Sequence, residues 1–384
     1  MRQLLNPVLN PLLNPVLIPL LMPVLMVCAG LSQATPISPA ADSQVIERLP
    51  PITRVSTSRD PVVAAAEARA LIDASRREGD PRFAGRALAR LARWQAPAEA
   101  AAAPTEVLLV LAEAEQYLHE FDAATRRLQA LVQRDPGSAQ AWLLLATLHR
   151  VQGRYEASDQ ACAALRRLRV QPYADACSAE NAALRGEHGS ARAQLLALIE
   201  RATDPSTQAW LATSLAELEQ RAGRVAESDA AWRQSLQAAA DTYTAIGYAD
   251  FLLDQQRPQE AWDRLSAQPR GEGVLLRLAI AARRLQRPEA VALSRELRER
   301  HAQADLRPED SGHQRERALR ALDIDQQPAA ALAHALKNIQ RQREPVDLLL
   351  LARSAQAAGN PKALAQARQL AQQQGLVDAR LDAL

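Results

Sequence analysis

The sequence predicts an all-α protein built from repeated antiparallel helix pairs. Hydrophobic residues make up 48% of the chain but aromatic residues only 3%, and most of the apolar side chains are Ala and Leu, which favour helices. Glycine is scarce at 14 residues, and the β-branched and aromatic enrichment that is typical of strands is missing. From about residue 61 onward, helical segments of 12–16 residues alternate with short turns in a period of 33–34 residues.

The first 34 residues differ from the rest of the chain. Arg2 is their only charge, and a long run of Leu, Val, Asn and Pro follows it. The segment ends with Ser32 and Ala34, small residues at the positions that a signal peptidase requires before Thr35. It therefore predicts a secretory signal peptide, residues 1–34, with cleavage after Ala34, and hence a periplasmic or secreted mature protein.

Two alternatives stay open for this segment. A retained membrane anchor is disfavoured, because each proline removes a backbone donor and obstructs the preceding helical turn, and prolines recur every four residues (Pro7, Pro11, Pro15, Pro19 and Pro23). The same prolines are unusual in a signal peptide and leave open whether Met1 is the true start. A lipoprotein anchored at Cys28 is also disfavoured, because Val27 precedes it where a small residue is expected.

Residues 35–60, rich in Pro, Ser and Thr, predict a flexible linker.

The clearest repeat unit spans residues 138–168. In it an aromatic residue is followed three and four residues later by Leu and a small residue, and glycine and a second aromatic mark the inter-helix turn (Trp142, Leu145, Ala146, Gly153 and Tyr155). The preceding unit supplies Ala112 and Ala124 and closes with Asp135 and Pro136. Ala112, Ala146, Ala179 and Ala216 recur at one place in successive first helices, where we expect the second helix to cross closely.

This pattern resembles the tetratricopeptide repeat (TPR) family, and together with the predicted signal peptide it indicates a bacterial exported member. The resemblance implies a right-handed α-solenoid, the TPR superhelix, of about nine antiparallel helix pairs, each of which buries its apolar faces against its neighbours. Residues 61–302 form the expected solenoid, residues 303–312 interrupt the period as a loop or hinge, and residues 313–384 predict degenerate TPR-like helices.

In this family the first helix of each pair lines a concave groove. Carried over to this sequence, the resemblance places two columns of side chains on that groove. One column contains the aromatic residues Tyr173, Trp210 and Tyr243, and the other contains the carboxylates Glu113, Glu180, Glu217 and Asp250. Aromatic rings beside carboxylates suit an extended and preferably cationic peptide. The alternative is that the carboxylates are merely solvated and the aromatic rings pack between repeats.

Two cysteines remain after signal cleavage. Cys162 lies in a second helix and Cys177 in the next first helix, and at 1.5 Å per residue they lie within about 3 Å of the same level. An oxidising compartment permits a disulfide between them. Two small buried thiols are the alternative, and the register turns Cys177 partly toward the groove.

The sequence contains no phosphate-binding glycine loop, nucleophile elbow, HExxH or CxxC motif, and its six histidines are scattered. We therefore expect no enzymatic activity, no cofactor and no metal. The net charge is only +2 and the basic residues are interspersed with acidic ones, so we expect no nucleic-acid partner. The leading interpretation is a non-enzymatic protein- or peptide-binding scaffold in the bacterial cell envelope, with no membrane span in the mature chain. A lipid-anchored envelope assembly component and an enzyme with an unrecognised site are the alternatives.

Overall fold

The computed structural model describes residues 59–78, 81–305 and 313–384. Every regular element in these ranges is helical and no strand is present among them. The predicted signal peptide and nearly all of the predicted linker lie outside the described residues. None of the described helices combines the length and the apolarity that crossing a membrane would require.

The described chain forms nine successive helix pairs, as the sequence predicted. The first helices of the pairs are α1 (Pro61–Glu78), α4 (Thr105–Tyr117), α6 (Ala139–Val151), α8 (Tyr173–Leu184), α10 (Pro205–Arg221), α12 (Thr242–Asp254), α14 (Glu272–Arg284), α16 (Gln314–Leu319) and α18 (Pro345–Ala357). Their partners are α2 (Pro81–Arg90), α5 (Phe121–Arg134), α7 (Tyr155–Arg167), α9 (His188–Arg201), α11 (Val225–Ala238), α13 (Pro258–Leu265), α15 (Glu289–Asp305), α17 (Pro328–Asn338) and α19 (Pro361–Gln374).

Four short elements complete the chain. η1 (Ala92–Trp94) and α3 (Pro97–Ala102) separate the first two pairs, η2 (Arg320–Ile324) extends α16 by a π-helical segment, and α20 (Ala379–Asp382) ends the chain. The predicted loop at residues 303–312 begins too early, because α15 continues to Asp305. The rest of that loop, residues 306–312, lies outside the described part of the chain.

Most first helices end in the same way. In seven of them the residue that stops the helix has a positive φ (His119, Gly153, Gly186, Gly223, Gln256, Gln286 and Gly359). The next N–H then bonds to the carbonyl five residues earlier, as from Arg154 to His149 at 2.7 Å. Gly153 marks its turn because glycine adopts this left-handed conformation readily. Between His119 and Gln286 these helix ends are 30 to 37 residues apart, so the period is less regular than 33–34 residues.

The small residues of the repeat are buried as expected. Ala112, Ala146, Ala179 and Ala216 have no exposed surface, and neither has Ala124 of the second helix α5. Trp142 lies at the edge of the core and donates its indole N–H to the carbonyl of Pro136 at 2.9 Å. This hydrogen bond connects the first turn of α6 to the Asp135–Pro136 turn that closes the unit before it.

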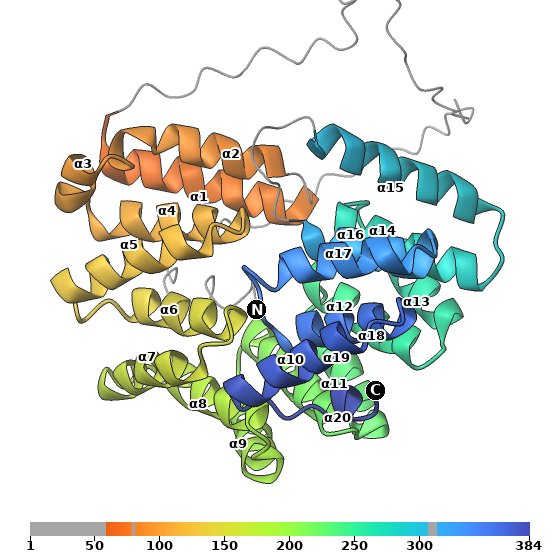
Figure 1. Ribbon diagram of the computed structural model, residues 1–384. Helices are drawn as coiled ribbons and strands as arrows, with labels where there is room; N and C mark the ends of the chain where they lie inside the picture. The colour runs from red at the N-terminus through yellow and green to blue at the C-terminus, as the bar shows by residue number, and fades with distance from the viewer. Residues whose placement is uncertain (1–58, 79–80, 306–312) are drawn as a thin grey trace, which may run out of the picture.

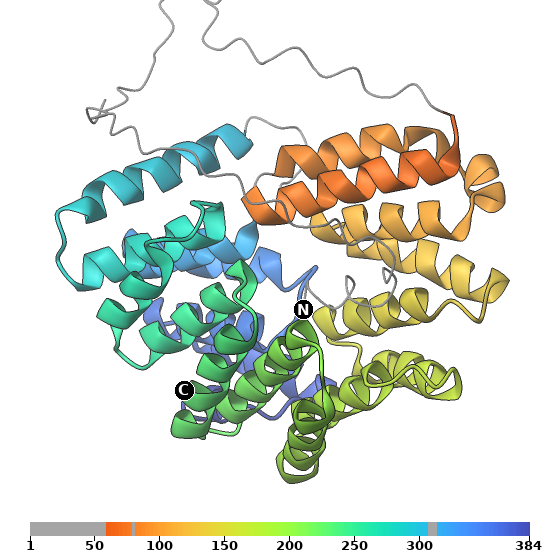
Figure 2. The same cartoon turned by 180° about the vertical axis from the view of Figure 1, so that it is seen from behind.

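The array curves until its last pairs meet its early ones. Figure 1 shows the pairs descending from α1 to α9 and rising through α10–α14 to α15, with α16–α20 returning in front of α10–α12. Figure 2, from behind, shows α10–α12 in front of these last helices. Main-chain hydrogen bonds join the two parts, from Arg343 N to Val151 O at 2.7 Å and from Val377 N to Leu184 O at 2.9 Å.

Tyr155, predicted as a repeat position, contributes to this closure. Its ring packs in a second apolar cluster with Leu184, Leu376 and the helices α17–α20, and its hydroxyl lies 3.5 Å from the Gln374 side chain. A side chain at Gly153 would overlap Gln374. The glycine at this turn therefore serves two purposes, because it permits the left-handed conformation and leaves space for the returning chain.

Candidate binding cavity

A cavity of about 2570 Å³ lies between the inner helices and the returning C-terminal segment. The ends of α1 and α4, the inner faces of α10, α12 and α14, and parts of α16 and α18 line it. Eleven carboxylates and ten arginines are among its lining residues. The wall is therefore rich in charge but balanced in sign, and it shows no excess that would attract a polycation or a polyanion.

The structure divides the predicted aromatic column. Tyr173 and Tyr243 line the cavity, at the starts of α8 and α12. Trp210 does not line it, because its ring stacks on that of Tyr173 with centroids 5.3 Å apart and planes 19° from parallel. Tyr173 is 6% exposed and Trp210 7%, so this pair mainly joins two repeats.

The predicted carboxylate column is also divided. Glu217 and Asp250 line the cavity, whereas Glu113 and Glu180 bind residues of neighbouring first helices. Glu113 accepts a hydrogen bond from Gln140 of α6 at 2.9 Å and lies 3.8 Å from Arg69 of α1. Burial raises the pKa of Glu113, although these neighbours oppose the effect.

Glu180 of α8 has equivalent contacts two repeats further on. It accepts a hydrogen bond from Ser214 of α10 and pairs with Arg150 of α6, so it joins three successive first helices. Both carboxylates therefore stabilise the stacking of the repeats, and neither is a free acceptor for a cationic ligand.

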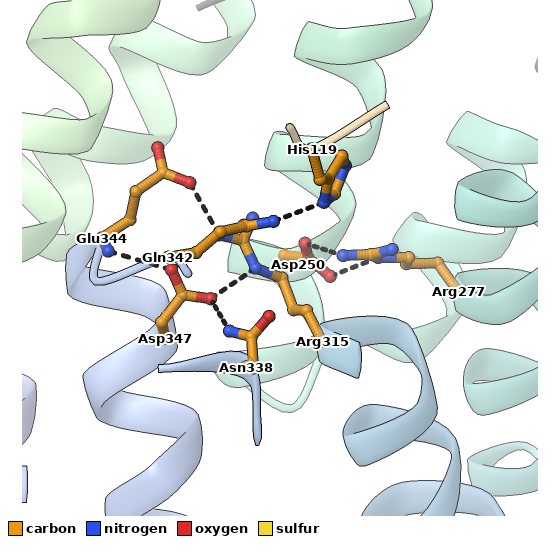
Figure 3. Close-up of polar contacts among 8 residues, drawn as sticks. All are labelled: His119, Asp250, Arg277, Arg315, Asn338, Gln342, Glu344 and Asp347. Carbon is orange, nitrogen blue, oxygen red and sulfur yellow. Dashed lines mark hydrogen bonds and ion pairs between the residues drawn. The ribbon is translucent and has the colours of Figure 1, made fainter. Parts of the chain in front are cut away.

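Asp250 lies on the cavity wall but already has a cation. Arg277 of α14 binds both of its carboxylate oxygens, each at 2.8 Å. Burial would lower the pKa of Arg277, but the charge and hydrogen bonds of Asp250 outweigh it, so the pKa lies above its ordinary value. Figure 3 shows this pair beside the larger network around Arg315.

Arg315 of α16 is the centre of that network. It binds both oxygens of Asp347, at 2.6 and 2.8 Å, and reaches Glu344 at 2.6 Å and the Gln342 carbonyl oxygen at 2.8 Å. Asp347 also accepts a hydrogen bond from Asn338 at 2.6 Å and, with Glu344, forms the capping box of α18. Burial would lower the pKa of Arg315, but Asp347 and Glu344 more than reverse this, so the guanidinium keeps its charge.

Gln342 connects this network to the early repeats. Its amide oxygen accepts from Arg315, so its amide nitrogen faces His119 at the end of α4, 2.5 Å from Nδ1 (Figure 3). Nδ1 must then be the acceptor, which places the imidazole proton on Nε2. His119 also stacks against His313, with centroids 5.8 Å apart, on the same wall of the cavity.

Cys162 and Cys177 form a disulfide that joins α7 to α8, with their Cα atoms 5.6 Å apart. Of the two alternatives that the sequence left open, the structure has the bonded one. The predicted orientation of Cys177 toward the groove is wrong, because the residue is only 1% exposed. Asn181 of α8 packs against this bond and donates to Ser158 of α7 at 3.0 Å.

Sequence reasoning missed the arginines of the inner wall, among them Arg221, Arg277, Arg315 and Arg353. The repeat itself could have indicated Arg221. The last residue of a first helix, two positions before the residue with positive φ, lines the cavity in α6 (Val151), α10 (Arg221) and α12 (Asp254). The described residues contain no group of three or more His, Cys, Asp or Glu side chains placed to hold a metal ion.

The fold has similarities to solved structures at low sequence identity. The human IFIT1 dimer with PPP-AAAA matches with a TM-score of 0.46 and 13% identity, covering 82% of this chain and 72% of that chain. The human IFIT1 dimer with m7Gppp-AAAA matches with a TM-score of 0.44 and 13% identity, covering 75% and 78%. Neither similarity bears on what this chain binds. No protein-family model matches the sequence, and no curated protein matches it.

Proposed function

We propose that this protein is a non-enzymatic TPR-type scaffold that binds an extended segment of a partner protein in its central cavity. The cavity itself carries the proposal. At about 2570 Å³ it is well above the range of roughly 300–1000 Å³ that suits small ligands, and most of its lining residues carry hydrogen-bonding side chains. Tyr243, which lines the cavity and is only half-buried, adds rigid aromatic surface of the kind that anchors peptides.

The proposed TPR relationship is supported by the period, by the seven left-handed helix ends and by the fully buried small residues at the helix crossings. The proposal that the protein is not an enzyme follows from the sequence, which has no catalytic motif. The partner need not be cationic, because ten arginines line the wall beside its eleven carboxylates and bind some of them, as Arg277 binds Asp250 and Arg315 binds Glu344.

A location in the cell envelope is the second part of the proposal. The disulfide between repeats supports this location, because disulfides persist in oxidising compartments. Export through a signal peptide would bring the protein to such a compartment. When the full chain is expressed in a bacterial host, we expect the mature protein in the periplasmic or secreted fraction to begin at Thr35. Mass spectrometry of the intact protein measures this directly. A lipid-modified chain beginning at Cys28 would instead establish the anchored alternative.

Peptide binding is tested by selection. Random peptides of about twelve residues, long enough to cross several repeats when extended, are displayed on phage and selected against the protein. The best binder is labelled with fluorescein and titrated by fluorescence anisotropy. Replacing Tyr243 by Ala should weaken its binding about tenfold, because aromatic anchors contribute a large share of binding energy.

Phe83→Ala is the matched control, since Phe83 is an aromatic residue of α2 outside the cavity lining. This variant should bind as the unmodified protein does. Failure to select any binder, or equal binding by the Tyr243→Ala variant, would refute the assignment of the cavity as the binding site.

A further inference from the structure

Two ion pairs on the cavity wall are longer than its bidentate pairs. Glu217 and Arg221 of α10 approach only to 4.0 Å, and Asp254 of α12 and Arg353 of α18 only to 3.8 Å. No hydrogen bond joins either pair in the described part of the chain, and those of Arg353 go to Asp323 instead. On the same wall, Arg277 and Arg315 bind their carboxylates bidentately at 2.6–2.8 Å.

Arg221 is the least satisfied of these groups. It lines the cavity and is only 7% exposed, yet its Nε is buried without a hydrogen-bond partner, and its guanidinium has no hydrogen bond to any described residue. A buried guanidinium normally uses several of its five donors. Burial lowers the pKa of Arg221 below its ordinary value, because Glu217 and Asp378 offset the loss of hydration only in part.

The repeat places Arg221 and Asp254 at equivalent positions of two successive first helices. They are the last residues of α10 and α12, each two positions before a left-handed helix stop. These helices touch where the hydroxyls of Thr213 and Thr244 lie 3.3 Å apart. Packed helices have axes about 8–10 Å apart, and an extended peptide advances about 3.3 Å per residue. Equivalent positions on two successive first helices are therefore spaced like peptide residues about three positions apart.

We propose that Arg221 and Asp254 form a subsite for a peptide carrying an acidic residue and a basic residue about three positions apart. The peptide carboxylate binds Arg221, and the peptide cation binds Asp254. Glu217 and Arg353 hold these two side chains loosely while the cavity is empty and release them to the ligand. The subsite rests on the proposed peptide-binding function and adds to it the chemistry of the partner.

Three fluorescein-labelled synthetic peptides of about twelve residues test the pattern. One carries Glu and Lys three positions apart, one carries Glu at both positions and one carries Lys at both, in otherwise identical Ser- and Ala-containing sequences. Anisotropy at moderate salt should show the mixed peptide binding at least about tenfold more tightly than either of the others, as expected for two charge-assisted contacts. Equal or tighter binding of the all-Glu or all-Lys peptide would overturn the proposal.

Variants then locate the contacts. Arg221→Gln and Asp254→Asn should each weaken binding of the mixed peptide about tenfold or more. Arg295→Gln, on the outer helix α15 and outside the cavity lining, is the matched control and should leave binding unchanged. Circular dichroism and thermal unfolding verify that each variant is folded. Unchanged binding in a folded Arg221→Gln variant would rule the subsite out.

This result can be separated from that of the selection experiment. If a selected peptide binds in a Tyr243-dependent manner while the mixed peptide shows no preference over the others, the cavity binds peptides but the charge-pair subsite is wrong. If selection yields no cavity-dependent binder at all, the peptide-binding function itself fails, and this subsite fails with it.

Discussion

Replacing Asp347 by Asn should lower the free energy of unfolding by about 3–5 kcal/mol, the usual cost of breaking a buried ion pair from one side. Asp347 has almost no exposed surface and accepts hydrogen bonds from Arg315, Asn338 and the Glu344 backbone. An amide in its place keeps the size but loses the charge that holds the buried Arg315 guanidinium. Chemical denaturation followed by circular dichroism measures the change.

Asp382→Asn on α20 is the control, because Asp382 is exposed and should cost little. The double variant Arg315→Met with Asp347→Leu should lose less than the sum of its single variants, since it removes both charges together. A loss of under about 1 kcal/mol for Asp347→Asn would mean that the network contributes little to stability, contrary to its geometry.

Removing the disulfide should have the second large effect. In the Cys162→Ser, Cys177→Ser variant we expect the free energy of unfolding to fall by about 3 kcal/mol, because the bond closes a loop of 15 residues in the unfolded chain. Unmodified protein treated with a reductant under unfolding conditions should unfold at the lower temperature of the variant, as measured by calorimetry. The variant itself should not respond to the reductant, and equal stability of the oxidised and reduced proteins would contradict a structural role.

The sequence predicted the repeated elements well, because they depend on local signals. The glycines at 153, 186 and 223 stop helices by their left-handed conformation, and the fully buried alanines at the crossings leave no space for a larger side chain. Where His119 or Gln256 stops a helix instead, the signal is weaker, and the expected boundaries drift accordingly. The end of α15 was placed too early, at residue 302, whereas the helix continues to Asp305, three residues before Pro308.

The candidate site was only partly predictable, because contacts between repeats decide which side chains reach the cavity. Glu113 and Glu180 belong to the expected column, but Gln140 and Ser214 of the next helices bind them. The spacing predicted that Trp210 would line the groove, but its ring stacks on Tyr173 and does not reach the cavity. No periodic signal indicated that residues 339–384 would return to the early repeats, since that contact depends on the summed curvature of the whole array.

This return changes how the protein should unfold. In an open stack of repeats each unit contacts only its neighbours, so the terminal units can fray while the middle stays folded. Here Gln342 bonds to His119, and Val377 to Leu184, across some two hundred positions of sequence. The final helices therefore cannot separate from the stack without also losing their contacts with the ends of α4, α6 and α8.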